Sequence, residues 1–206
     1  MGHVPVLLEE PIMGLVALYG AGSGALHAVT GPDHWLSLGP AALSATRRSF
    51  GIGLRWGVGH ALGTLALSIP FLLAVRLVSL ERLATFGDRL SAVALIVMGA
   101  WSLFTLARSG GSGGAREGRQ PLIIGLVHGI GGAGSLMLFM PVLVSGSLEK
   151  TLLFLLAFAA GSTLAMAALT FALARLGTKL ARSALPRAQR VLSALSIAVG
   201  SVWLVA

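Results

Sequence analysis

The chain has 206 residues, of which 55% are hydrophobic and only 11% are charged, and it contains no cysteine. Because a soluble domain carries roughly 25% charged residues, this composition predicts an integral membrane protein. The lack of cysteine excludes disulfides, thiolate metal sites and iron–sulfur clusters. The net charge of +8 does not indicate nucleic-acid binding, because the basic residues lie between apolar runs, where the positive-inside rule accounts for them.

Apolar runs divide the chain into stretches that can each cross a bilayer, which takes about 20 residues in a helix. The first is expected to be a retained helix, because Glu9 and Glu10 stand where a cleaved leader would be basic. The sequence therefore predicts an all-α polytopic membrane protein of six transmembrane helices in one domain, 1–206. The predicted spans are about 12–30 (with an apolar continuation over 35–45), 52–75, 90–107, 121–144, 151–173 and 191–205.

The polar segment 108–120 is rich in glycine and serine and predicts a flexible loop between two halves. The loops on the same side of the membrane as 108–120, this loop included, hold 11 lysine and arginine residues, whereas the loops on the opposite side hold 4. Because such residues concentrate in cytoplasmic loops, we expect the loop 108–120 in the cytoplasm and both termini outside.

The two halves resemble one another at a shift of 101 residues. Each half holds three spans, an odd number, so the halves would have opposite orientations in the membrane. Inverted repeats with broken helices near the centre are a recurrent transporter architecture. We therefore predict two inverted three-helix repeats, about 10–107 and 121–206. Scarce or small residues coincide at this shift: His27 with His128, Pro40 with Pro141, and Gly99 with Gly200.

The most informative motif places His27, Asp33 and His34 in an otherwise apolar segment. Ionisable groups in hydrocarbon are costly and usually functional, and imidazole and carboxylate are ligands of borderline divalent metals. On an unbroken helix the two histidines would lie about 10 Å apart along the axis, too far for one ion. Gly31 and Pro32 predict a break that lets the histidines meet. The alternative is a histidine bonded to a neighbouring helix carbonyl.

A second histidine, His60, lies inside the second span among Gly57, Gly59 and Gly63. These glycines would allow another helix to approach closely. We predict that His60 is a further ligand, with Thr64 one turn on as its hydrogen-bond partner. The alternative is a packing seam that contains one satisfied histidine.

A third motif surrounds His128 with glycines that weaken the helix, and it is the repeat partner of the first break. In this half Gly134 and Ser135 replace Asp33 and His34. The second half is therefore predicted to donate one strong ligand where the first donates three. The alternative is a glycine packing motif of the GxxxG kind.

Other polar residues are predicted to be weak ligands or hydrogen-bond partners of ligands. His3 and the nearby backbone amides could chelate nickel or copper in a square plane, although incidental placement is the alternative. Ser162 is the positional counterpart of His60. The four tryptophans favour membrane-interface or packing roles over cofactor contacts. The set of weaker candidates comprises His3, Thr30, Thr64, Ser135 and Ser162.

The motif from His27 to His34, followed by the glycine–histidine motifs at His60 and His128, resembles the UreH-type membrane proteins, compact relatives of the nickel/cobalt permeases. The resemblance covers nearly the whole chain and implies a multi-pass protein of a bacterial or archaeal cell membrane, linked to urease accessory functions. It marks His27, Asp33 and His34 as the metal-recognition signature. Five residues separate His27 from Asp33 here, whereas the larger permeases have four; the spacing is similar to that of the HupE/UreJ proteins.

The leading hypothesis is a permease for Ni²⁺, or Co²⁺, carried as substrate, with no prosthetic group and no catalytic residue. Its partners would be the transition-metal ion and the lipid bilayer, and a homo-oligomer is compatible with the sequence. Two alternatives remain open. One is an anion exporter or accessory subunit with proton-binding histidines, and the other is an intramembrane metalloenzyme, which would need a general base besides Asp33. The predicted metal ligands are His27, Asp33, His34, His60 and His128.

Overall fold

The computed structural model describes residues 6–44, 48–74, 80–108, 119–131, 147–180 and 184–205. Within these ranges the chain is all-α, without strands, which confirms the predicted fold class. The helices are α1 (Val6–Thr30), α2 (Pro32–Ser44), α3 (Ser49–Ala74), α4 (Leu80–Arg108), α5 (Gln120–Gly131), α7 (Leu148–Lys179) and α8 (Leu185–Val205).

Among the described residues, four helices are long and apolar enough to cross a membrane. The sequence predicted six. The second predicted span lies on α3, which is not among the four, and the fourth begins on α5 and continues beyond the described residues. With 12 residues, α5 is about 18 Å long, shorter than a hydrocarbon core of about 30 Å. The four candidate spans are Glu10–Thr30, Asp88–Arg108, Leu148–Lys179 and Leu185–Val205.

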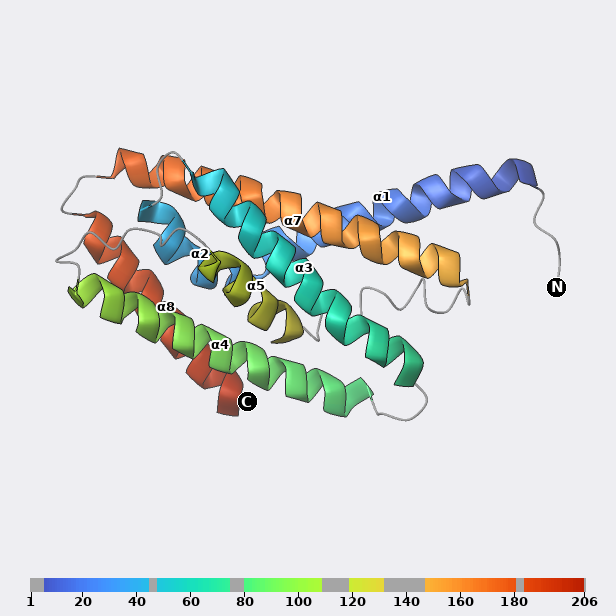
Figure 1. Ribbon diagram of the computed structural model, residues 1–206. Coiled ribbons are helices and arrows are strands. Elements are labelled where there is room, and N and C mark those ends of the chain that lie inside the picture. The colour runs from blue at the N-terminus through green and yellow to red at the C-terminus, as the bar shows by residue number, and fades with distance from the viewer. Residues whose placement is uncertain are drawn as a thin grey trace.

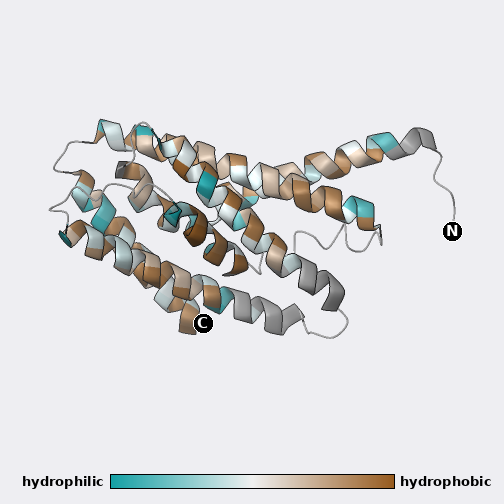
Figure 2. Cartoon of the chain, in the orientation of Figure 1, coloured by the Kyte–Doolittle hydropathy of each residue, from teal (hydrophilic) through white to brown (hydrophobic). Residues whose placement is uncertain are grey.

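The long helices pack in pairs around the two short ones. α1 lies along α7, α4 lies along α8, and α3 contacts both α5 and α7. Figure 1 shows α2 and α5 between the longer helices, with the N-terminal part of α1 projecting beyond its neighbours. Large apolar side chains such as Leu18, Leu26 and Leu156 face outward and are more than 60% exposed. Figure 2 shows apolar residues along the long helices, and an outward-facing apolar surface is typical of helices in contact with lipid.

Glycines on both partners bring α3 and α5 into backbone contact. A Cβ atom at Gly59 or Gly63 of α3 would overlap the backbone of α5, and one at Gly125 or Gly129 would overlap the backbone of α3. The Gly129 contact is with the backbone of His60 itself. The predicted close helix approach at this glycine motif is therefore present, and both helices of the crossing contribute to it.

The crossing of α1 with α7 is built in the same way. A Cβ atom at Gly20 or Gly24 of α1 would overlap backbone atoms of α7, and one at Gly161 of α7 would overlap Ala21 of α1. Small residues thus replace a hydrophobic driving force as the basis of helix association, as expected where both lipid and side chains are apolar.

The crossing of α4 with α8 combines a glycine contact with buried polar groups. Gly99 faces the backbone of Ser193, and Gly200 faces the backbone of Ala92. The Ser193 hydroxyl lies 2.8 Å from the Ser102 hydroxyl and 2.8 Å from the Gln189 carbonyl, which accepts a hydrogen bond from it. We call the serine hydroxyls of this crossing the serine seam; its residues are Ser102, Ser193 and Ser196.

Candidate metal centre

The helix is interrupted at Gly31, which lies between the end of α1 at Thr30 and the start of α2 at Pro32. The Gly31 N–H donates to the His27 carbonyl at 3.0 Å, and the His34 N–H donates to the Gly31 carbonyl at 3.2 Å. Pro32 opens α2, where its missing N–H costs nothing. A Cβ atom at Gly31 would collide with the His34 ring and with the Asp33 carboxylate. Any larger residue here would therefore displace the two polar side chains, which fold back over the turn.

This break brings the first two histidines together. The ring centroids of His27 and His34 lie 4.7 Å apart, with the rings nearly perpendicular. The Trp35 indole N–H donates to the Val29 carbonyl at 2.6 Å, which ties the start of α2 to the end of α1. The two imidazoles are thus held beside one another by residues on both sides of the turn.

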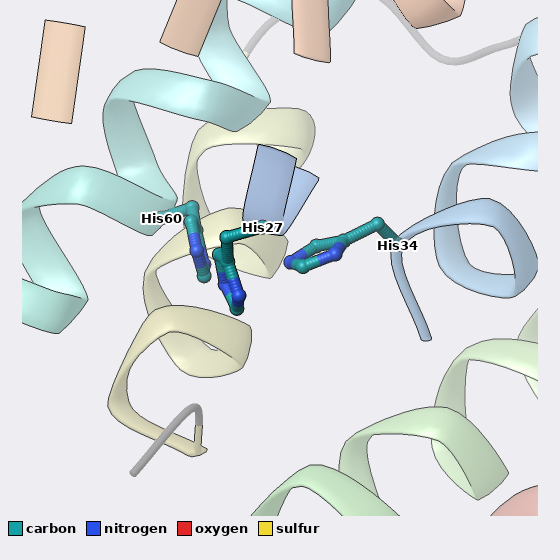
Figure 3. A group of neighbouring side chains, drawn as sticks. All are labelled: His27, His34 and His60. Carbon is teal, nitrogen blue, oxygen red and sulfur yellow. The ribbon is translucent and has the colours of Figure 1, made fainter. Parts of the chain in front are cut away.

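The crossing of α3 with α5 adds two more imidazoles. His60 on α3 lies 5.7 Å from His27 and 5.2 Å from His34, measured between ring centroids. His128 on α5 lies 5.2 Å from His34 and 5.8 Å from His60. Figure 3 shows the His27 and His60 rings side by side, with His34 pointing toward them from the opposite side. Four helices therefore contribute one histidine each to a single cluster.

Asp33 supplies the negative charge of the cluster. Its Oδ2 lies 2.9 Å from Nε2 of His128, and its Oδ1 lies 3.5 Å from Nδ1 of His34. The carboxylate retains 14% exposure, whereas the His34 side chain is fully buried. The pair formed by Asp33 and His128 joins the first half of the chain to the second.

Five imidazole nitrogens of the cluster are buried without a hydrogen-bond partner: Nε2 of His27 and both ring nitrogens of His34 and His60. Buried polar groups are normally paired, and each one that is not costs about 1–3 kcal/mol. A neutral imidazole can satisfy at least one of its nitrogens by binding a metal ion. The alternative in which these histidines are satisfied by helix carbonyls is therefore absent for His34 and His60.

The cluster contains two overlapping sets of ligand atoms, His27–His34–His60 and Asp33–His34–His128, and within each set the atoms lie within 4.8 Å of one another. Two atoms bound to one ion at about 2 Å can lie at most about 4 Å apart, so small side-chain rotations would complete either set. His34 belongs to both. All five predicted ligands are thus brought together.

The weaker candidates lie elsewhere or have other partners. Thr30 is exposed and donates to the Leu26 carbonyl. Thr64 is buried and its hydroxyl lies 3.4 Å from the Gly129 carbonyl, which places it at the crossing of α3 with α5. Ser162 is buried but donates to the carbonyl of its own helix at 3.2 Å. His3 and Ser135 lie outside the described residues.

Trp56 is a member of the site that the sequence did not single out. It is 2% exposed, stacks on His60 with centroids 5.4 Å apart, and meets the His34 ring edge-on at 5.8 Å. Trp56 and His60 are four residues apart on one helix, so they share a face. That spacing was the available signal, and it separates Trp56 from Trp35, Trp101 and Trp203, which are all partly exposed.

Comparison with known proteins places the chain near two plant proteins. It is 29% identical over 164 residues to the chloroplast protein FOR GROWTH AND FERTILITY 2 of Arabidopsis thaliana, an alignment covering 72% of this chain and 44% of the relative. It is 33% identical over 82 residues to the chloroplast protein FOR GROWTH AND FERTILITY 1 of the same plant, covering 39% of this chain and 22% of the relative. The chain therefore spans less than half the length of these relatives.

No family model matches the chain, and no solved structure does. These findings correct three expectations. The predicted membership of the UreH-type and nickel/cobalt permease group is wrong, because the curated relatives are chloroplast proteins. The predicted nickel or cobalt permease function, with its link to urease, loses its basis for the same reason. The predicted bacterial or archaeal cell membrane is likewise not supported, and what stands is four helices capable of spanning a membrane.

Proposed function

We propose that this protein is a membrane protein that binds a divalent first-row transition-metal ion at its buried histidine cluster. The observation that carries the proposal is the set of five imidazole nitrogens that are buried and unpaired. Folding leaves these atoms without a protein partner, which is unfavourable unless another group binds them. The names of the relatives mention the chloroplast, growth and fertility but no ligand, so the proposal rests on these side chains.

The chemistry of the donor atoms favours a transition metal over Mg²⁺ or Ca²⁺. Four of the five candidate ligands are imidazoles, which suit zinc, copper, iron and nickel, whereas Mg²⁺ and Ca²⁺ prefer all-oxygen sites. Asp33 would contribute one negative charge against the two positive charges of the ion. Its Oδ2 lies 2.9 Å from Nε2 of His128, and both residues belong to the second set of candidate ligand atoms.

We further propose that the chain forms two inverted repeats around this site. Under the 101-residue shift, α1 corresponds to α5 and α3 corresponds to α7. The pairing of α1 with α7 then corresponds to that of α5 with α3, and both crossings use glycines against backbone. Gly99 and Gly200, which the shift superimposes, meet the facing helices at the crossing of α4 with α8. A pseudo-twofold axis through that crossing accounts for all three pairings.

Metal titration of the purified protein tests the proposal. The detergent-solubilised protein is stripped with a chelator and titrated with Zn²⁺, Ni²⁺ and Cu²⁺, with bound metal measured after desalting. We expect stoichiometric binding by the unaltered protein. His34→Ala removes the ligand that both sets share, so it should weaken binding by about 100-fold or more, beyond the loss typical for a group that only supports a ligand.

Thr30→Ala is the matched control, because Thr30 lies in the same turn but is exposed and bonded within its own helix. Its metal affinity should equal that of the unaltered protein. A folded protein that retains none of the three ions, or a His34→Ala variant with unchanged affinity, would overturn the proposal.

A further inference from the structure

A cavity of about 120 Å³ lies along one face of α4, between that helix and α2, α3, α5 and α8. Its wall on α4 runs from Met98 through Trp101 and Thr105 to Leu106, positions that share one side of a helix and span about 12 Å along its axis. The Trp101 side chain is 49% exposed, so this wall reaches the outer surface of the helix bundle. The cavity therefore lies beside the apolar surface that faces lipid.

The hydroxyl groups in the lining already have partners within the protein. Ser37 donates to the His34 carbonyl at 3.1 Å, Thr105 donates to the Ser102 carbonyl at 2.9 Å, and the Ser102 hydroxyl lies 2.8 Å from that of Ser193. The described lining is otherwise mainly apolar and includes no charged side chain. It therefore favours an apolar occupant, because a charged group would lose its hydration there without gaining a counter-charge.

Exposed arginines lie at one end of this cavity. Arg119 and Arg190 each adjoin a lining residue in the chain, and Arg108 lies two residues beyond the last lining residue of α4. The acidic residues of the described ranges lie in the histidine cluster or in the N-terminal parts of α1, α4 and α7. Figure 1 shows the starts of these three helices at the opposite end of the bundle from the end of α4. Positive charge at the arginine end is therefore not balanced by a described carboxylate.

We propose that the cavity binds part of one acyl chain of an anionic membrane lipid, whose headgroup contacts Arg108, Arg119 and Arg190. The chain would lie along α4, which places the headgroup where that helix ends. The volume is a little smaller than that of a cavity of about 150 Å³ that holds benzene, so it suits a stretch of one chain. Basic pockets between membrane helices bind anionic headgroups in this way. The site is independent of metal binding and goes beyond it.

Native mass spectrometry of the delipidated, detergent-solubilised protein tests the site, because it counts the lipids that stay bound to each chain. The protein is titrated with phosphatidylglycerol and with phosphatidylcholine that carry identical acyl chains, so the two probes differ only in the headgroup. We expect the first phosphatidylglycerol to bind about tenfold or more tightly than the first phosphatidylcholine, since each nearby arginine favours an anionic headgroup about fivefold.

Substitutions then separate the headgroup contacts from the cavity. Arg190→Gln should weaken the binding of phosphatidylglycerol about fivefold and leave that of phosphatidylcholine unchanged, because only the anionic headgroup loses a partner. Ala41→Phe, which fills the cavity from α2, should abolish the tight binding of the first phosphatidylglycerol. Met98→Trp fills the same cavity from α4 and should have the same effect, so the result does not depend on one variant that fails to fold.

Arg175→Gln is the matched control, since Arg175 is an exposed arginine in the C-terminal part of α7, a helix that contributes no described residue to the cavity wall. Its binding of both lipids should be unchanged. The proposal is overturned if the unaltered protein binds the two lipids equally. It is also overturned if Arg175→Gln weakens phosphatidylglycerol binding as much as Arg190→Gln does, which would indicate surface charge alone, or if a folded cavity-filling variant keeps the tight binding.

Discussion

The histidine cluster and the serine seam are both buried and polar, but only one of them is internally satisfied. In the seam, Ser193 has two oxygen neighbours at 2.8 Å and Ser196 donates to the Leu95 carbonyl at 2.9 Å. In the cluster, both ring nitrogens of His34 and His60 have no partner. The seam is thus complete as it stands, whereas the cluster is complete only when something else occupies it.

This difference separates a structural use of polar residues from a functional one. Hydroxyls that pair with facing helices contribute about 1 kcal/mol each to helix association. Unpaired buried imidazoles destabilise the fold unless a ligand offsets their cost. The two regions should therefore respond in opposite ways when their polar groups are removed.

The largest expected effect concerns the backbone contact on which the cluster depends. Gly59→Ala places a Cβ atom against the Leu122 carbonyl of α5, and neither backbone can yield without separating the helices that carry His60 and His128. We expect a loss of about 3 kcal/mol or more in the free energy of unfolding, together with loss of metal binding. Thermal unfolding and Zn²⁺ titration of the purified variant measure both.

Gly51→Ala is the control for this variant, because Gly51 lies on the same helix and a Cβ atom there would meet nothing within 4 Å. Helix propensity alone then acts, and stability should rise by about 0.5–1 kcal/mol. Equal stability of the two variants would show that the crossing of α3 with α5 is not tightly packed.

The next effect concerns removal of an unpaired imidazole from the histidine cluster. His60→Leu replaces a buried unpaired imidazole by an apolar group of similar size, so it should raise the free energy of unfolding of the metal-free protein by about 1–3 kcal/mol. The same variant should lose the stabilisation that Zn²⁺ gives the unaltered protein, which is about 2.7 kcal/mol at a metal concentration 100 times the dissociation constant. Unfolding with chelator and with Zn²⁺ measures both quantities.

A His60→Leu protein that is less stable than the unaltered chain in chelator would contradict this account, because it would mean that His60 is satisfied without a ligand. Trp56→Phe is the control for packing in the same region. It keeps an aromatic wall beside His60 and should leave the Zn²⁺ stabilisation in place.

The local part of the site was predictable from the sequence. A Gly-Pro pair between His27 and His34 predicts a break, and a break places the two rings together. The glycine spacing around His60 and His128 predicts close helix packing. These inferences depend on residues near one another in the chain, where periodicity and backbone preferences act directly.

The longer-range features could not be predicted. Nothing in the sequence shows that His128 pairs with Asp33, since 95 positions separate them and the contact depends on how α5 docks. Gln189 stands between Arg187 and Arg190, where the charge pattern indicates a membrane interface, yet it is buried against α2. The resemblance to nickel/cobalt permeases failed for a different reason: a few shared ligand positions indicate a chemistry but do not establish a family.

The smallest expected effect concerns the serine seam, whose hydroxyls are already hydrogen-bonded. Ser193→Ala removes a hydroxyl that bridges α8 and α4, and it leaves the Ser102 hydroxyl without this partner. The free energy of unfolding should fall by about 1 kcal/mol, with metal affinity unchanged, because the hydrogen bonds of the seam go to serine and to helix carbonyls and not to the cluster. Ser102→Ala should cost a similar amount, and the double variant should cost less than the sum, since the second substitution has no hydrogen bond left to break. If the double variant is instead additive, Ser102 and Ser193 are not coupled, and their hydrogen bond between α4 and α8 contributes nothing to stability.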